Sequence, residues 1–224
     1  FFGRVNLDWE NKYLLEVNLR ADQSSRFLSN KRTGYFPSAS VAWRMDQEAF
    51  MENWVEKGLS NLKLRLSYGS LGNNSVGNYD AIATYANKPS SGSAFNYTLN
   101  NALVLGLAQA QLANPNLTWE STYMTNVGVD FGLVNNKLTG TIDYFNKKTK
   151  DILINLPAPD VHGTASIPKQ NSATVTNQGI EMTLGWQDHI GDFSYGVNGK
   201  FTFVRNKVNK FKGKEKGGQS IDGA

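Results

Sequence analysis

The sequence contains no cysteine and only two histidines among its 224 residues. The absence of cysteine excludes disulfide bonds, thiolate metal ligands and cysteine nucleophiles. The two histidines, His162 and His189, are isolated from each other. Because a metal site gathers several ligands at close spacing, the sequence predicts no metal and no cofactor.

Long apolar runs are missing as well. The longest, residues 102–108, is far shorter than the roughly 20 residues that a membrane-spanning helix needs. The mean hydropathy of −0.43 is also too polar for a bundle of membrane helices. A membrane β-barrel is not excluded, because only alternate residues of its strands face lipid.

Signals of nucleic-acid binding and of catalysis are weak. The formal net charge is only +4, whereas nucleic-acid-binding domains concentrate basic residues on one face. Gly72 and Gly77 have the spacing of a phosphate-binding loop, but Asn78 stands where that motif requires lysine. His162 has no nucleophile elbow beside it. The sequence therefore predicts neither a nucleic-acid partner nor an enzyme.

An alternation of apolar and polar side chains with period two dominates the chain. Residues 3–9 place Val5, Leu7 and Trp9 on one face of an extended strand and polar residues on the other. Residues 13–22 repeat the pattern after a link of three residues, which predicts an antiparallel hairpin. Each run approaches the roughly 9 to 11 residues with which a tilted strand crosses a bilayer.

Six further runs have the same period, which predicts an all-β chain of about eight antiparallel strands. They cover residues 34–44, 61–69, 121–134, 137–152, 177–186 and 193–206.

The links between these runs differ in length at the two ends of the strands. The links after the first, fifth and seventh runs are short. The link after the seventh run is "DHIGD". Those after the second, fourth and sixth are long and cover residues 23–32, 71–118 and 151–173. On the short-link side, residues 45–60 predict one short helix with Asp46 as cap and Gly58 near its end. Short turns at one edge and long loops at the other are typical of outer-membrane barrels.

Aromatic side chains near the strand ends favour the same interpretation, because such rings accumulate at membrane interfaces. They are Trp9, Tyr13, Trp43, Tyr68, Trp119, Tyr123 and Trp186. The alternation alone suits a soluble β-sandwich equally well. A secreted sandwich that binds carbohydrate, or an adhesin module, therefore stays as the alternative.

The order of several segments resembles the later barrel region of the SusC/RagA family of TonB-dependent outer-membrane transporters. These segments are "FFGRVNLDWENKYLLEVNLRADQSSRF", "GYFPSASVAWR", "LSNLKLRLSYGSLGNN", "NPNLTWES", "TNVGVDFGLVNNKLTGTIDYFNKKTKDIL" and "NQGIEMTLGW". The resemblance implies a large plugged barrel in the outer membrane of a Gram-negative bacterium. It further implies import of oligosaccharides or peptides together with a SusD-like surface lipoprotein, with energy delivered through TonB.

The chain departs from that family in extent. Barrels of this class have about 22 strands around a plug, whereas this sequence predicts about eight. No signal peptide, TonB box, plug or leading domain is recognisable. We therefore expect residues 1–224 to form part of a barrel domain, with the TonB complex contacting an N-terminal part that lies outside this chain.

The predicted barrel assigns roles to the two faces of the strands. Lipid-facing candidates are Val17, Leu64, Val129 and Phe201. Lumen-facing candidates, which either pair with one another and the plug or contact cargo, are Arg4, Asn6, Asp8, Glu16, Asn18, Arg20, Lys63, Arg65, Asn126, Asp130, Asp143, Glu181, Asn198 and Lys200.

The predicted long loops supply candidates for contacts outside the membrane. Tyr79, Tyr85, Phe95 and Tyr97 have rings that stack on sugars, although they also suit packing of the loop or contact with the lipoprotein. Asp22 and Arg26 are expected to pair at the start of the first long loop. The lysines from Lys207 to Lys216 predict a solvated loop, with contact to anionic outer-leaflet lipid as a second interpretation.

Overall fold

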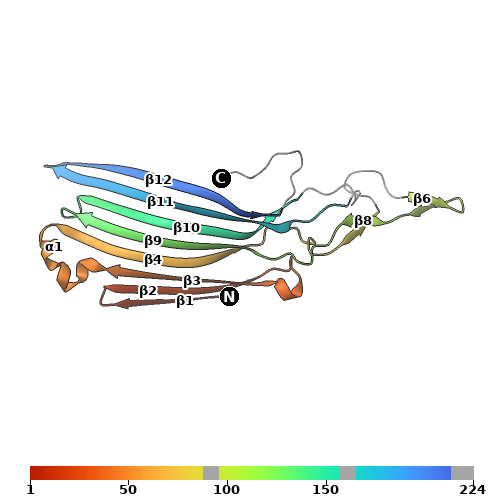
Figure 1. Ribbon diagram of the computed structural model, residues 1–224, viewed down its shortest axis with the longest axis horizontal. Coiled ribbons are helices and arrows are strands. Elements are labelled where there is room, and N and C mark those ends of the chain that lie inside the picture. The colour runs from red at the N-terminus through yellow and green to blue at the C-terminus, as the bar shows by residue number, and fades with distance from the viewer. Residues whose placement is uncertain (88–95, 157–164, 213–224) are drawn as a thin grey trace.

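Eight long strands form a single antiparallel sheet in the computed structural model, which describes residues 1–87, 96–156 and 165–212 (Figure 1). Each strand pairs with the next long strand along the chain, so the topology is up-and-down. The long strands are β1 (Phe2–Trp9), β2 (Tyr13–Gln23), β3 (Thr33–Arg44), β4 (Leu59–Asn73), β9 (Glu120–Leu133), β10 (Leu138–Ile154), β11 (Gln170–Ile190) and β12 (Phe193–Phe211).

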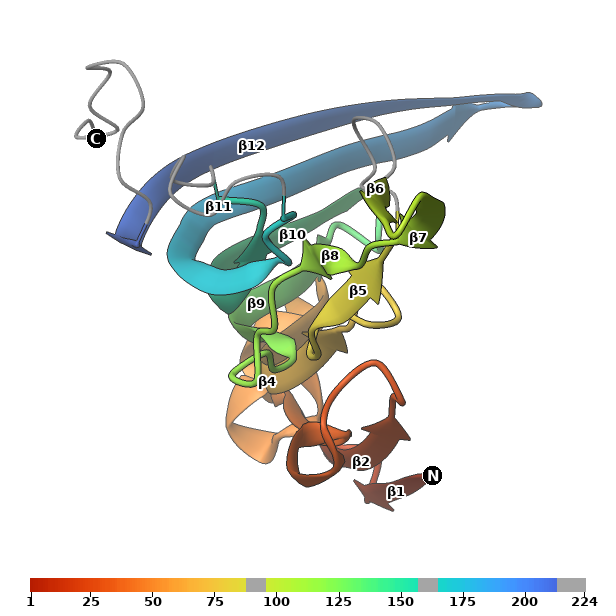
Figure 2. The ribbon, with the colours of Figure 1, turned by 90° about the vertical axis from the view of Figure 1, so that its right-hand side faces the viewer.

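The sheet confirms the predicted all-β meander and excludes the sandwich. Viewed from one end, the strands succeed one another from β12 to β1 without folding back into a second layer (Figure 2). Within the described ranges, no second sheet covers the apolar side chains, many of which are exposed. A sandwich would bury that face against its partner sheet, so the alternative fold is wrong.

The bounds of the last two strands differ from the prediction. β11 begins at Gln170 instead of residue 177 and ends at Ile190 instead of residue 186. The predicted turn "DHIGD" therefore shrinks to Gly191 and Asp192, and His189 lies in β11. Polar residues occupy both faces of β11 between Gln170 and Gln178, which removes the period-two signal there. Lys207 and Lys210 likewise belong to β12 and not to a loop.

The short connections all lie at one end of the sheet (Figure 1). Residues 134–136 take positive φ, a conformation that asparagine tolerates at Asn135 and Asn136. The helix predicted over residues 45–60 is shorter than expected: two 3-10 turns, η2 (Met45–Gln47) and η3 (Ala49–Met51), precede α1 (Glu52–Glu56). Among the described residues, no helix is long and apolar enough to cross a membrane.

The opposite end of the sheet holds the long connections, where the sequence predicted only loops. The turn η1 (Ser29–Lys31) follows β2. Between β4 and β9 lie two small antiparallel sheets, one pairing β5 (Thr84–Ala86) with β8 (Ala108–Gln111) and one pairing β6 (Asn96–Leu99) with β7 (Ala102–Leu105). Strands of three or four residues are too short to show a period.

A buried cluster ties these long connections to the sheet. Phe27 and Leu117 are each 1% exposed and pack with Phe36, Val76 and Trp119. The Trp119 ring lies 5.2 Å from that of Phe27, and its Nε1 donates to the Arg32 carbonyl at 3.3 Å. The prediction that Trp119 lies at the membrane interface is therefore wrong, because its ring fills this cluster.

Register continuity across the sheet separates one apolar face from one polar face. We call the side bearing the following two unbroken rows the apolar face. The first row is Leu7, Leu15, Val41, Leu66, Val127, Tyr144, Ile180 and Phe203, and the second is Trp9, Tyr13, Trp43, Leu64, Val129, Ile142, Met182 and Phe201. Every position in both rows carries an apolar or aromatic side chain.

Replacing Phe27 with alanine tests the buried cluster. Removing a buried phenylalanine costs about 3 to 5 kcal/mol, so we expect amide hydrogen exchange at Ser24, Leu117 and Thr118 to accelerate by about 100-fold or more. The measurement is hydrogen exchange with mass spectrometry on the full-length protein. Phe193→Ala is the control, because Phe193 is 67% exposed. Equal effects of the two substitutions would contradict the cluster's role.

Candidate functional site

The polar face carries all fourteen residues that the sequence assigned to a lumen. The register aligns Arg4 with Asn18 and Asn6 with Glu16 on the first hairpin. In the middle of the sheet it aligns Lys63 with Asp130 and, two residues further, Arg65 with Gly128 and Asp143. The remaining candidates occupy the same face through the pairings of β9 to β12. Their lumenal role stays a prediction.

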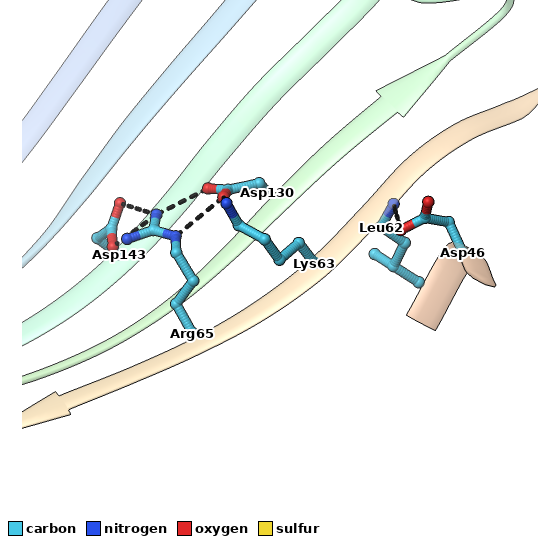
Figure 3. Close-up of polar contacts among 6 residues, drawn as sticks. All are labelled: Asp46, Leu62, Lys63, Arg65, Asp130 and Asp143. Carbon is cyan, nitrogen blue, oxygen red and sulfur yellow. Dashed lines mark hydrogen bonds and ion pairs between the residues drawn. The ribbon is translucent and has the colours of Figure 1, made fainter. Parts of the chain in front are cut away.

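A charged network of four side chains lies at the centre of this face (Figure 3). Arg65 on β4 donates to both oxygens of Asp130, from Nε at 2.9 Å and from Nη2 at 2.7 Å. Its Nη2 also reaches Asp143 on β10 at 3.2 Å. Lys63 Nζ lies 3.2 Å from Asp130. Two cations therefore neutralise two carboxylates across three adjacent strands, and we call these four residues the polar-face network.

Gly128 makes the longest of these contacts possible. It lies on β9 directly between Arg65 and Asp143, with which it pairs in register. A Cβ at this position would collide with the Asp143 carboxylate and lie 2.9 Å from Arg65 Nη2. The guanidinium can cross β9 only because the strand has no side chain there. The signal in the sequence that points to this contact is a glycine at a polar-face position between two charged neighbours.

Smaller contacts order the polar side chains of the first hairpin. Arg4 Nε donates to Asn18 at 2.6 Å, and Asn18 donates in turn to Glu16 at 2.8 Å. Asp8 accepts the backbone N–H of Asn11 in the turn.

The expected pair of Asp22 and Arg26 does not form. Asp22 pairs with Arg20 at 2.6 Å on its own strand, while Arg26 donates to the Asn74 carbonyl. Asp22 pairs with Arg20 because residues i and i+2 of a strand lie on the same face.

Five lumen candidates make no side-chain hydrogen bond or ion pair to the rest of the described chain. They are Asn6, Asn126, Glu181, Asn198 and Lys200.

Two acidic residues stabilise the short-turn end: Asp46, which the sequence predicted as a helix cap, and Glu48, which sequence reasoning missed. Asp46 Oδ1 accepts the Leu62 backbone N–H at 3.3 Å (Figure 3). Its Oδ2 accepts from Gln47 and Arg44. Burial opposes ionisation of Asp46, but these three donors together hold its pKa below the ordinary value. The carboxylate thus joins η2 to β4 and does not cap α1, contrary to the prediction.

Glu48 fixes two aromatic rings at the short-turn end of the sheet. Its Oε1 accepts the Tyr13 hydroxyl at 2.6 Å and the Trp43 Nε1–H at 3.0 Å, and these hydrogen bonds lower the pKa of Glu48. The two rings stack with centroids 6.4 Å apart. Their polar tips are thus satisfied at the end of the apolar face, an arrangement that suits rings at a membrane interface.

The four lipid-facing candidates all lie on the apolar face. Leu64, Val129 and Phe201 belong to the second row. Val17 pairs with Val5 and lies beside the first row, on the side away from the second. Phe201 is 60% exposed and Val17 is 44% exposed. Large apolar side chains exposed in continuous rows indicate a surface made for an apolar surrounding. Contact with lipid itself stays a prediction.

The aromatic candidates of the long connections lie at the opposite end from α1. Tyr79, Tyr85 and Tyr97 are exposed, with Tyr85 on β5 and Tyr97 on β6. Phe95 and His162 lie outside the described residues. The small sheet of β6 and β7 also exposes Leu99, Leu103 and Leu105, which sequence reasoning did not assign to any site.

The chemistry of these surfaces is that of fixed charges and hydrogen-bonding groups. In the ranges 1–87, 96–156 and 165–212, no group of three or more histidine or acidic side chains is placed to hold a metal ion. The polar-face network offers paired charges and not a nucleophile beside a base. It can therefore orient polar solutes or another protein segment.

Comparison with known proteins agrees with this geometry. The family of TonB-dependent receptor-like β-barrels matches residues 1–224. TonB-dependent receptor SusC from Bacteroides thetaiotaomicron is 31% identical over 221 residues, which covers 95% of this chain and 21% of SusC. TonB-dependent receptor P3 from Formosa agariphila is 32% identical over 207 residues, which covers 92% of this chain and 20% of the receptor.

A solved structure matches as well. A chain of the RagAB peptide importer superimposes with a TM-score of 0.79 at 30% identity, covering 94% of this chain and 22% of that one. The chain thus spans about a fifth of the length of the relatives it matches. These matched proteins are receptors and importers, not enzymes.

The single sheet with its two faces defines a wall section of an antiparallel β-barrel. The chain belongs to the TonB-dependent receptor-like β-barrel family, and the resemblance to the SusC/RagA transporters is confirmed.

Replacing Arg65 with methionine tests the polar-face network. The substitution leaves Asp143 without its cation and Asp130 with Lys63 alone, so we expect a loss of about 1 to 3 kcal/mol in the free energy of unfolding. Urea unfolding of the full-length protein in detergent measures it. Arg20→Met is the control, because its pair with Asp22 is exposed and should cost less than about 1 kcal/mol. An unchanged stability of R65M would show that the network is dispensable.

Proposed function

We propose that the chain forms part of the barrel wall of an outer-membrane TonB-dependent transporter in a Gram-negative bacterium. The observation that carries this proposal is the sheet itself, with two unbroken apolar rows on one face and an ion-paired polar face behind them. In a bilayer the first face would meet hydrocarbon and the second a wet lumen. The similarity to SusC and RagAB supports the same assignment.

The two outer strands require further strands beside them. β1 and β12 each pair on one side only within this sheet, and an open edge inside hydrocarbon leaves backbone N–H and C=O groups unsatisfied. We infer that residues 1–224 are one section of a larger barrel domain whose other strands cover both edges. The end with α1 would then be periplasmic, since barrels of this kind have short periplasmic turns and long external loops.

The cargo is proposed to be an oligosaccharide or a peptide. RagAB is a peptide importer, and the exposed rings of Tyr79, Tyr85 and Tyr97 suit stacking on sugars or on apolar side chains. Polar residues of the lumenal face would supply hydrogen bonds along the path. TonB would act on the plug and N-terminal part of the transporter, outside this wall section.

The partner is proposed to be a SusD-like surface lipoprotein. Leu103 and Leu105 lie on the same face of β7 and are 70% and 69% exposed, in a hairpin at the far end from α1 (Figure 1). Exposed leucines at an external tip favour a protein–protein contact. The hairpin therefore offers a docking point for a lipoprotein that covers the barrel mouth.

Uptake by living cells tests the proposal. A strain that lacks the full-length gene should lose energy-dependent uptake of one fluorescent oligosaccharide or peptide pool, and the wild-type gene should restore it only when TonB is present. L103S/L105S should weaken co-purification of the lipoprotein by about tenfold or more, because two apolar contacts are lost. Leu71→Ser is the control, at an equally exposed leucine outside the hairpin. Uptake that survives deletion of the gene would refute the proposal.

A further inference from the structure

Four basic side chains project from the apolar face near its long-loop end. Lys148 and Lys150 lie on β10, and Arg205 and Lys207 lie on β12. Lys150 Nζ is 5.1 Å from the centroid of the Tyr123 ring, and Tyr123 shares a face with Val127 on β9. The register carries this face from Lys148 through Thr176 of β11 to Lys207, and from Asn146 through Gln178 to Arg205. We call these four side chains the basic patch.

No acidic residue offsets the basic patch. Residues 144–150, 174–180 and 203–211 contain neither aspartate nor glutamate. All four basic side chains are exposed, and none of them forms an ion pair within the part of the chain that the structure describes. This surface therefore carries a net positive charge.

Apolar side chains continue from the basic patch toward the centre of the same three strands. Tyr144, Ile180 and Phe203 form part of an unbroken apolar row and are 45%, 41% and 58% exposed. Lys148 is four residues further along β10, which is roughly 13 Å along the strand. The same strands thus present an apolar surface and, nearer the long-loop end, the cationic surface of the basic patch.

The spacing within the basic patch suits more than one phosphate group. Lys148 and Lys207 flank one intervening strand, so their backbones are roughly 10 Å apart. Thr176 and Gln178 lie between them and add neutral hydrogen-bonding groups. Ammonium and guanidinium groups are the usual partners of phosphate in proteins.

We propose that the basic patch binds the phosphate groups of an acylated, phosphorylated lipid of the outer leaflet, whose acyl chains lie on Tyr144, Ile180 and Phe203. This inference rests on the proposed function, because it requires the apolar face to meet lipid. The adjoining apolar row favours a lipid over a free phosphate ion, since an ion gains nothing from apolar contact.

Neighbouring residues on β10 provide a matched pair of variants. Lys148 projects from the apolar face and Lys147 from the polar face, so Lys148→Gln and Lys147→Gln remove the same charge one position apart. The probe is bis-phosphorylated lipid A, titrated into the full-length protein in uncharged detergent and followed by native mass spectrometry. Each basic side chain near an anionic lipid surface contributes roughly fivefold in affinity.

We expect K148Q to weaken binding of the probe roughly fivefold and K148Q/K207Q roughly 25-fold, while K147Q stays within about twofold of wild type. The dephosphorylated probe should not distinguish the variants. Unchanged affinity in K148Q/K207Q, or an equal loss in K147Q, overturns the proposal. Displacement of the probe by an equimolar amount of inorganic phosphate overturns the assignment to a lipid. Uptake assays test the transporter proposal separately. Intact uptake together with unchanged lipid binding in K148Q/K207Q would therefore refute only the proposal that the basic patch binds lipid.

Discussion

Each strand of this sheet must satisfy two different surroundings at once, and alternation of side chains is the only way a β-strand can do so. A shift of one residue in any strand would exchange its two faces. The structure keeps the register from β1 to β12 so that apolar residues of all eight long strands align in rows. The polar-face network and the basic patch both depend on this alignment, because each combines side chains from several strands.

In the polar-face network, charged side chains of neighbouring strands form ion pairs with one another. Arg65 contacts both Asp130 and Asp143, and Lys63 contacts Asp130, so the four charges of the network neutralise one another. Such pairing lowers the cost of placing carboxylates next to a low-dielectric barrier. Three of the five unpaired candidates, Glu181, Asn198 and Lys200, lie on β11 and β12, whereas Asn6 lies on β1 and Asn126 on β9.

The strand order and the two faces were predictable from the sequence because they depend on local period. The runs around Val17, Val129 and Phe201 alternate cleanly, and the structure places these residues on the predicted face. Prediction failed where local period carries no information. The outer part of β11 is polar on both faces. Trp119 lies next to a strand end but packs in a cluster formed by four segments of the chain.

Contacts that cross strands were equally beyond the sequence. The reach of Arg65 over Gly128 to Asp143 depends on register between three strands, and the bonds from Tyr13 and Trp43 to Glu48 join a hairpin to a later connection. Arg65 and Asp143 are 78 residues apart and Tyr13 and Glu48 are 35 apart, whereas Trp43 is only five residues from Glu48. The resemblance to transporters implied the barrel, but it did not identify the individual pairs.

The central claim is that the two faces of the sheet meet lipid and water respectively, and paired cysteine labelling tests it most directly. Single cysteines at Val17, Leu64, Val129 and Phe201, and at the neighbouring Glu16, Lys63, Asp130 and Lys200, would be introduced into the full-length protein in its native membrane. A bilayer-restricted probe should label only the first set, and a water-soluble thiol reagent only the second. If the first set resists both reagents, those side chains lie in a protein core and the barrel assignment is wrong.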